Sequence, residues 1–238
     1  MQSSRTNASQ NVLPGCCMLS TAYLPPVEYF AVMANAEKVV IEKCEMFQKQ
    51  SYRTRCHIYS ANGLLSLTVP VKRDIHSDNL VESSLPSHKL LIDKVMIDYS
   101  KPWVLQHKRA LEAAYMTTPF FEYYKDDIFA ILESGESNLF NLNMRLTELF
   151  MEFIGISTPV EYSSEWLAEA PQGCIDLRNA IHPKSRETDM LERMQIKKPY
   201  YQVFSNKQGF ISNLSVIDLL CNEGPNSISF LKAESNRK

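Results

Sequence analysis

The chain has 238 residues, with 25 Lys and Arg against 27 Asp and Glu, so its formal net charge at pH 7 is −2. This balance argues against a nucleic-acid-binding protein, which would carry an excess of basic residues. A hydrophobic content of 45% is ordinary for a globular protein, and no apolar run is long enough to span a membrane.

Motifs for bound groups are missing from the sequence. Its seven glycines form no glycine-rich phosphate loop. The six cysteines are Cys16, Cys17, Cys44, Cys56, Cys174 and Cys221. Because none has the spacing of a zinc site, we expect reduced thiols, no metal and no cofactor. The first dozen residues lack the apolar segment of a signal peptide, which together with reduced thiols predicts a cytoplasmic protein.

The N-terminus predicts a disordered tail followed by a βαβ unit. Residues 1–15 are rich in Ser, Asn and Gln, and we expect them to be disordered, with a single domain over 16–238. A strand is predicted at Met18–Tyr23, a helix from Pro26 to Asn35, and a buried strand at Lys38–Glu42. The Tyr23–Pro26 loop then lies at a strand's carboxyl end, where a helix N-terminus favours an anion. Most such loops, however, bind nothing.

A two-residue period predicts a β-hairpin in the next stretch. Asn62-Gly63 is a strong turn signal between a strand over Phe47–Tyr59 and a returning strand over Leu64–Lys72. One face of the first strand is then apolar, with Tyr52, Thr54, Cys56 and Ile58. The other face collects Lys49, Ser51, Arg53, Arg55 and His57, joined by Lys72 of the second strand. This cationic face either holds an anion or is merely solvated.

The middle of the chain is predicted to be largely helical. A strand at Leu90–Asp98 precedes a helix over Trp103–Met116, for which Ser100 is the predicted cap. His107 lies on the apolar stripe of this helix, where it is either a packing residue or a general base. Further helices are predicted at Phe120–Glu133 and from Leu139 onward.

The C-terminal part is predicted to be mixed. Residues 158–173 read as irregular, and Ile175–Lys184 places acids and bases close to His182. A strand is predicted at Pro199–Phe204, and a final helix starts near Ser212 and ends at Gly224. The fold class is therefore α/β: an N-terminal βαβ unit with a β-hairpin, a largely helical region, and a mixed α/β C-terminal part.

Several of these segments together resemble the WbqC-like protein family. The resemblance is carried by Tyr23–Phe30, Lys49–Arg55, Leu67–Val71, Trp103 with His107 and Tyr115, Pro119–Phe121, Asp176–Arg178, Ile181–Lys184, Tyr201–Phe204 and Asn213–Leu220. Two departures stand out. The family usually has Gln-Pro where this chain has Ser20-Thr21. The family also often has Asn-Arg-Asn-Arg where this chain reads Tyr52 to Arg55, so the substrate is expected to differ if those amides contact it.

The resemblance implies a bacterial enzyme of surface-polysaccharide (O-antigen) synthesis, with acyl or aminoacyl (glycyl) transfer to a nucleotide-activated amino sugar. The expected partner is an anionic sugar nucleotide or an acyl-donor small molecule. The alternative is a non-catalytic module that binds a phosphorylated carbohydrate or a pathway partner. The candidate catalytic residues are His107 and His182. The candidate substrate-binding residues are Tyr23, Tyr29, Lys49, Arg53, Arg55 and Lys72.

Overall fold

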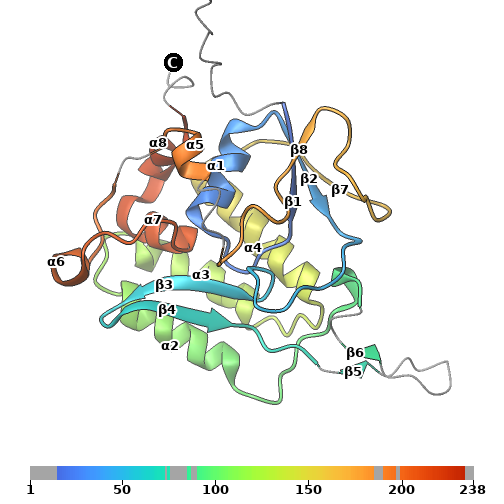
Figure 1. The fold of residues 1–238 in the computed structure, drawn as a ribbon. Helices are drawn as coiled ribbons and strands as arrows, with labels where there is room; N and C mark the ends of the chain where they lie inside the picture. Colours follow the sequence, from blue (N-terminus) through green and yellow to red (C-terminus); the bar gives the residue numbers. More distant parts are fainter. Residues whose placement is uncertain are drawn as a thin grey trace, which may run out of the picture.

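A parallel four-stranded sheet organises the fold (Figure 1). The structure is a computed structural model that describes residues 15–72, 74–75, 85–86, 90–184, 190–196 and 199–233. The strand order is β7-β2-β1-β8, and every neighbouring pair is parallel. The strands are β1 (Cys16–Ser20), β2 (Lys38–Glu42), β7 (Val160–Tyr162) and β8 (Cys174–Asp176). The predicted α/β class is confirmed; the tail at residues 1–15 lies outside the described residues except for Gly15.

The predicted βαβ unit is confirmed. Helix α1 (Val27–Asn35) connects β1 to β2, and Cys16 to Ser20 pair in register with Lys38 to Glu42. Both strands are apolar and almost wholly buried, as expected for parallel strands covered on both faces. Helix α1 is buried from Val27 to Met33, and its Phe30 packs edge-on against Phe150 of α4 (Leu139–Ile154).

The predicted hairpin is confirmed, with a later start. Strand β3 (Arg55–Ser60) pairs antiparallel with β4 (Gly63–Thr68), and Gly63 takes a positive φ of 98° at the turn. Residues 51–54 form a turn instead of the predicted strand, so the alternation of faces begins only at Arg55. In Figure 1 the hairpin runs beside α2 (Trp103–Tyr115), with the parallel sheet above it. Two further short strands, β5 (Asp74–Ile75) and β6 (Leu85–Pro86), pair with each other.

The helical middle region is confirmed, but two details are wrong. Helix α3 (Phe121–Leu132) and α4 follow α2 as predicted. The predicted strand at residues 90–98 is a 3₁₀ turn, η2 (Ile92–Lys94), flanked by isolated bridges, because alternating apolar residues also suit a chain packed irregularly over a core. Ser100 does not cap α2, whose N-cap is Pro102 without a side-chain bond.

The C-terminal part is mixed, as expected. It contains α5 (Met190–Arg193), α6 (Ser205–Gln208), α7 (Val216–Glu223), η3 (Gly224–Asn226) and α8 (Ser227–Leu231). The predicted strand at residues 199–204 is wrong. The Gln202 side chain bonds the backbone of Ile211 from both its amide nitrogen and its oxygen, at 2.9 Å each, and so replaces a strand partner.

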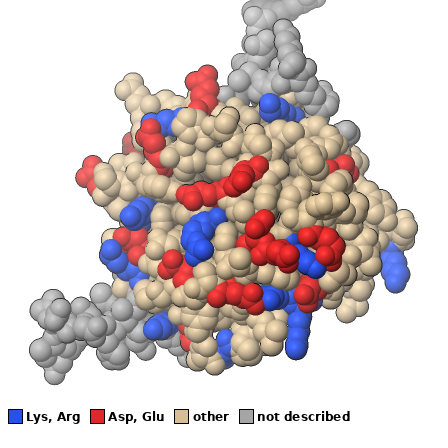
Figure 2. Space-filling view, turned by 180° about the vertical axis from the view of Figure 1, so that it is seen from behind, with Lys and Arg blue, Asp and Glu red and all other residues tan. Residues whose placement is uncertain are grey.

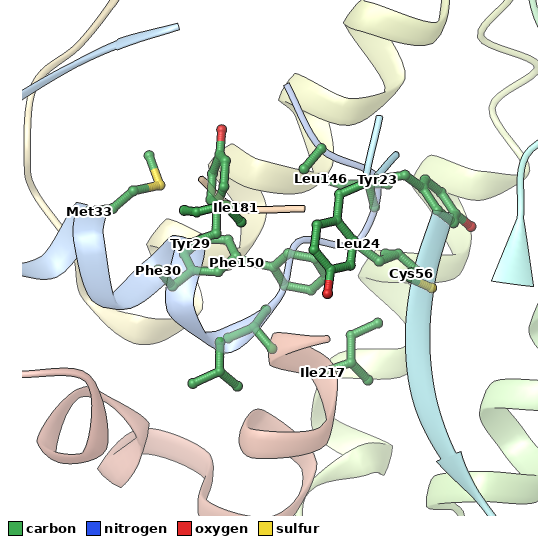
Figure 3. Packing of buried hydrophobic residues seen from close by; sticks show 14 of the residues in the cluster. Tyr23, Leu24, Tyr29, Phe30, Met33, Cys56, Leu146, Phe150, Ile181 and Ile217 are labelled. Atoms are coloured by element: carbon green, nitrogen blue, oxygen red, sulfur yellow. The ribbon is translucent and has the colours of Figure 1, made fainter. Parts of the chain in front are cut away.

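A continuous apolar core joins the sheet, the helices and the hairpin (Figure 3). Tyr23, Leu24 and Phe30 lie beside Phe150, and Cys56 points from β3 into the same core. Cys56 is thus a packing residue, as its parity predicted. None of the helices in the described ranges is long and apolar enough to cross a bilayer.

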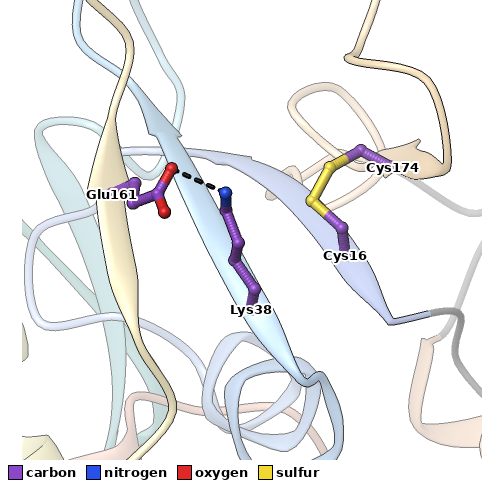
Figure 4. The surroundings of a disulfide bond; sticks show 4 residues. All are labelled: Cys16, Lys38, Glu161 and Cys174. Carbon is purple, nitrogen blue, oxygen red and sulfur yellow. Dashed lines mark ion pairs between the residues drawn. A yellow bond between two sulfur atoms is a disulfide. The ribbon is translucent and has the colours of Figure 1, made fainter.

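One expectation about the cysteines is wrong. Cys16 and Cys174 form a disulfide between β1 and β8, while Cys17, Cys44, Cys56 and Cys221 are free (Figure 4). The two cysteines are direct register partners on adjacent strands, with Cα atoms 4.4 Å apart. Sequence spacing could not reveal this pair because 158 positions separate its members.

Candidate functional site

The carboxyl edge of the sheet gathers several buried polar residues, among them Ser20, Glu42 and Glu45. Strands β1, β2 and β8 end at Ser20, Glu42 and Asp176, and the segments that follow them meet at this edge. Tyr23 N–H donates to the Tyr52 carbonyl at 2.8 Å, which ties the entry of the hairpin to the end of β1. In open α/β sheets this edge is where ligands bind.

A buried ion pair stands at the centre of the edge. The Arg53 guanidinium donates to both carboxylate oxygens of Glu45, with Nε at 2.8 Å from Oε1, and also to Ser20 Oγ at 2.7 Å. Arg53 is only 2% exposed. The expectation that Arg53 lies on the outer face of the hairpin is therefore wrong, because the turn at residues 51–54 directs it inward, where Glu45 neutralises it. Whether Arg53 contacts a substrate stays a prediction.

A second ion-pair network holds a neighbouring loop. Arg178 bonds Asp176 through Nε at 3.0 Å and Glu42 through Nη1 at 3.2 Å. The same Nη1 donates to the Leu167 carbonyl at 2.6 Å, and Leu167 N–H donates to Glu42 at 3.2 Å. Arg178 and Glu42 thereby fix the loop that carries Trp166.

These segments enclose a cavity of about 500 Å³, here called the edge cavity. Its lining residues are Cys44, Glu45, Met46, Gln48, Leu91, Trp166, Ala168, Arg178 and Asn179. Its walls are mainly apolar, with Trp166 61% exposed. A long hydrogen bond of 3.4 Å joins Gln48 Nε2 to Asn179 Oδ1, so both amides are available to a ligand.

Four basic side chains have no acidic partner among the residues that the structure describes: Arg55, His57, His182 and Lys184, here called the cationic cluster. Arg55 is half-buried, and its Nε is buried without a hydrogen-bond partner among the described residues. Lys184 Nζ donates to Gln50 Oε1 at 2.7 Å, which is an uncharged partner. Burial lowers the pKa of both His57 and His182, and the charge of Arg55 adds to the effect on each. Arg55 therefore lies near both imidazoles.

His182 is neutral at pH 7 and has a defined tautomer. Partial burial lowers its pKa most, followed by the charges of Arg53, Lys184 and Arg55. Lys184 N–H donates to His182 Nδ1 at 3.1 Å, so the neutral ring carries its proton on Nε2. In this arrangement His182 offers a ligand a hydrogen-bond donor.

His107 is placed in the core of α2, with 4% exposure. Its Nδ1 lies 2.8 Å from the Tyr23 hydroxyl. Burial lowers its pKa to about 4. Burial is thus the cause of this low pKa, which fits the packing interpretation of His107, whereas the charges of Arg53 and Arg55 add to the effect of burial on His182.

The remaining predicted site residues do not come together at one point. Tyr23 and Tyr29 are core residues, and the Tyr29 hydroxyl donates to the Ser20 carbonyl at 3.0 Å. Lys49 is exposed, and it is close to the cationic cluster only in sequence. Lys72 is exposed near Asp98, and its charge is one of the causes that lower the pKa of Asp98. Whether any of these residues binds a substrate stays a prediction.

The N-terminus of α1 does not offer the expected anion site. Val27 N–H donates to the Leu214 carbonyl at 2.9 Å, and Glu28 N–H donates to Asn213 Oδ1 at 3.0 Å. The C-terminal segment thus already satisfies the amides that an anion would need. A ligand at this helix end would have to displace the 213–214 segment.

Sequence reasoning missed four residues of the edge cavity: Gln48, Trp166, Arg178 and Asn179. Only Arg178 carried a signal, because Asp176-Leu177-Arg178 stands in the segment that carries the family resemblance. Trp166 lies in a stretch without periodicity. In the described residues no cluster of three or more His, Cys, Asp or Glu could hold a metal ion.

The fold and the edge define an α/β protein with basic and amide side chains at the carboxyl end of a parallel sheet. Comparison with protein families matches residues 21–185 to the WbqC-like protein family, so the chain belongs to that family. It is also 25% identical over 236 residues to the uncharacterized protein Rv1507c of Mycobacterium tuberculosis (strain ATCC 25618 / H37Rv), covering 90% of this chain and 96% of that protein. No solved structure matches the chain.

Proposed function

We propose that the chain binds a nucleotide-activated amino sugar, or the acyl donor for it, through phosphate groups held by the cationic cluster. The observation that carries this proposal is Arg55. Its Nε is buried without a partner among the described residues, and a buried charged donor without an acceptor is unfavourable until an anion supplies one. A phosphate accepts bidentate hydrogen bonds from such a group.

The pairing of charges near the cluster favours a small anion as the ligand. Arg53 is neutralised by Glu45, and Arg178 by Asp176 and Glu42, which leaves Arg55 and Lys184 without carboxylate partners among the described residues. On the face opposite that of Figure 1, basic and acidic side chains are interspersed (Figure 2). A local pair of cations in a chain with a net charge of −2 suits a phosphate or pyrophosphate better than a polyanion.

The proposed reaction is acyl or aminoacyl transfer to the amino group of the sugar, as part of surface-polysaccharide synthesis. The nucleophilic amine must lose a proton before it attacks the acyl carbon, and the developing oxyanion needs a donor. We assign this role to His182 Nε2–H, which would donate to the oxyanion or to a phosphate oxygen.

A second candidate, the non-catalytic module that binds a phosphorylated carbohydrate, has one observation in its favour. Neither predicted histidine presents a free Nδ1 as the base that amine transfer needs: Nδ1 of His182 accepts from Lys184 N–H, and Nδ1 of the buried His107 lies 2.8 Å from the Tyr23 hydroxyl. Mass spectrometry of a sugar nucleotide incubated with thioester or aminoacyl-ester donors distinguishes the candidates, since only an enzyme adds the acyl mass.

Arg55→Gln tests the anion site directly. Titration calorimetry with pyrophosphate should show an affinity at least tenfold weaker than that of the native chain, as expected for about 1.5–3 kcal/mol per lost charge-assisted bond. The matched control is Arg109→Gln, an exposed arginine on α2. Equal pyrophosphate affinity in the native and Arg55→Gln proteins, or no binding at millimolar pyrophosphate, contradicts the proposal.

The cytoplasmic location expected from the sequence is also part of the proposal. The Cys16–Cys174 disulfide is an observation against it, because disulfides persist mainly in oxidising compartments. Trapping thiols with an alkylating agent in intact cells, before lysis, shows which state the pair has where the protein resides.

A further inference from the structure

We propose that the edge cavity holds the nucleobase of the bound nucleotide, stacked on the indole of Trp166. This inference rests on the proposed function, because it takes the phosphates to lie in the cationic cluster. It adds a second subsite and names its ligand chemistry as a flat, uncharged heteroaromatic ring.

The charges around the edge cavity exclude an anion from it. Glu45 is engaged by Arg53, and Arg178 is engaged by Asp176, Glu42 and two backbone carbonyls. These charged groups have their partners within the protein. A second phosphate there would meet Glu45 without a free cation to offset it, whereas a neutral ring would leave both ion pairs intact.

The walls of the cavity fit a planar ring. Trp166 is 61% exposed, although the backbone carbonyl of the adjacent Leu167 is bonded to Arg178. Met46 and Leu91 add further apolar surface, and Gln48 and Asn179 add amides with both donor and acceptor groups. Stacking on an exposed aromatic ring together with amide contacts to a polar edge is the general way in which proteins bind a base. A volume of about 500 Å³ accommodates a nucleoside and exceeds what a single sugar ring would fill.

The two subsites are connected through shared elements. Gln48 lines the edge cavity and also accepts from Arg53 Nη1 at 3.4 Å, and Arg53 lies close enough to His182 to lower its pKa. Asn179 lies on the cavity wall and stands three positions before His182 in the sequence. Lys184 reaches back to Gln50 at 2.7 Å, so residues 48–55 and 178–184 form a common border between cavity and cluster. A nucleoside diphosphate is the class of molecule with a neutral ring at one end and two phosphates at the other, joined through a ribose.

The test compares pyrophosphate with a panel of nucleoside diphosphates by titration calorimetry. We expect at least one nucleoside diphosphate to bind tenfold or more tightly than pyrophosphate, as base stacking on an aromatic side chain predicts. Trp166→Ala should abolish that preference and leave pyrophosphate affinity unchanged, whereas Trp166→Phe should retain most of it. Tyr123→Ala, which removes an aromatic ring exposed on α3, is the matched control and should change neither affinity.

Fluorescence gives an independent readout because the chain has two tryptophans and Trp103 is buried. Acrylamide quenches mainly Trp166, so a bound base should protect the signal while pyrophosphate alone should not. Pyrophosphate binding that depends on Arg55, without any gain from a base or any effect of Trp166→Ala, overturns this inference and leaves the proposed function standing. Trp166-dependent binding of amino-sugar phosphates but not of nucleoside diphosphates also overturns it, in favour of a sugar subsite. Base-dependent binding that is insensitive to Arg55→Gln supports the cavity and contradicts the proposed function.

Discussion

Removing the charge of Arg53 should destabilise the fold strongly, whereas removing the charge of Arg55, two positions later, should change its stability little. Arg53 is 2% exposed and donates to both oxygens of the equally buried Glu45, whereas Arg55 has no acidic partner in the described part of the chain. Arg53→Met leaves the Glu45 carboxylate buried and unpaired. Breaking a buried pair in this way costs about 3–5 kcal/mol of folding stability. Arg55→Gln removes a charge that has nothing to neutralise it, and the free energy of unfolding should change by less than about 1 kcal/mol.

Urea unfolding followed by circular dichroism measures both variants, with the m-value checked for two-state behaviour. The double variant Arg53→Met/Glu45→Met is the decisive control. It removes both charges at similar volume, and it should regain most of the lost stability because no isolated charge remains buried. A loss below about 1 kcal/mol for Arg53→Met, or a double variant no more stable than the single one, would refute the reasoning.

Three further predictions concern the disulfide and two buried titratable side chains. In a denaturing thiol assay, four of the six cysteines should react without reductant and six after reduction, because Cys16 and Cys174 are paired; six reactive thiols at the outset would show that the pair is open. Burial raises the pKa of Asp218 from 3.8 to about 6. The free energy of unfolding should therefore fall by about 3 kcal/mol as pH rises from 4 to 6, because the buried carboxyl must then lose its proton. Asp218→Asn should remove this pH dependence from the stability measured by urea unfolding. Burial lowers the pKa of His107 from 6.5 to about 4, so acidification from pH 6.5 to 4 should destabilise the fold by about 3 kcal/mol. His107→Gln should lack this loss. If the variant loses as much stability on acidification as the native chain, the burial of a neutral imidazole is contradicted.

The βαβ unit and the helices could be predicted because their signals are local. Lys38–Glu42 was placed with the bounds that the structure has, since a short apolar run between polar residues permits few alternatives. Helices α2, α3 and α4 follow apolar stripes whose period is itself the cause of their packing. The strand proposed at residues 199–204 failed because the Gln202 side chain makes bonds that no periodicity encodes.

The candidate site was only half predictable, and Arg53 and Arg55 show why. The alternation of side chains along a strand would put Arg53 and Arg55 on the same face, but this alternation holds only where the chain is a strand. A turn at residues 51–54, supported by a bond from Ser51 Oγ to the Gln48 carbonyl at 2.7 Å, rotates Arg53 inward before β3 begins. Its partner Glu45 lies eight positions earlier, beyond the reach of any strand or helix period. The sequence could therefore indicate that basic side chains gather here, but only the tertiary structure separates the arginine that is already neutralised from the one that still lacks an anion.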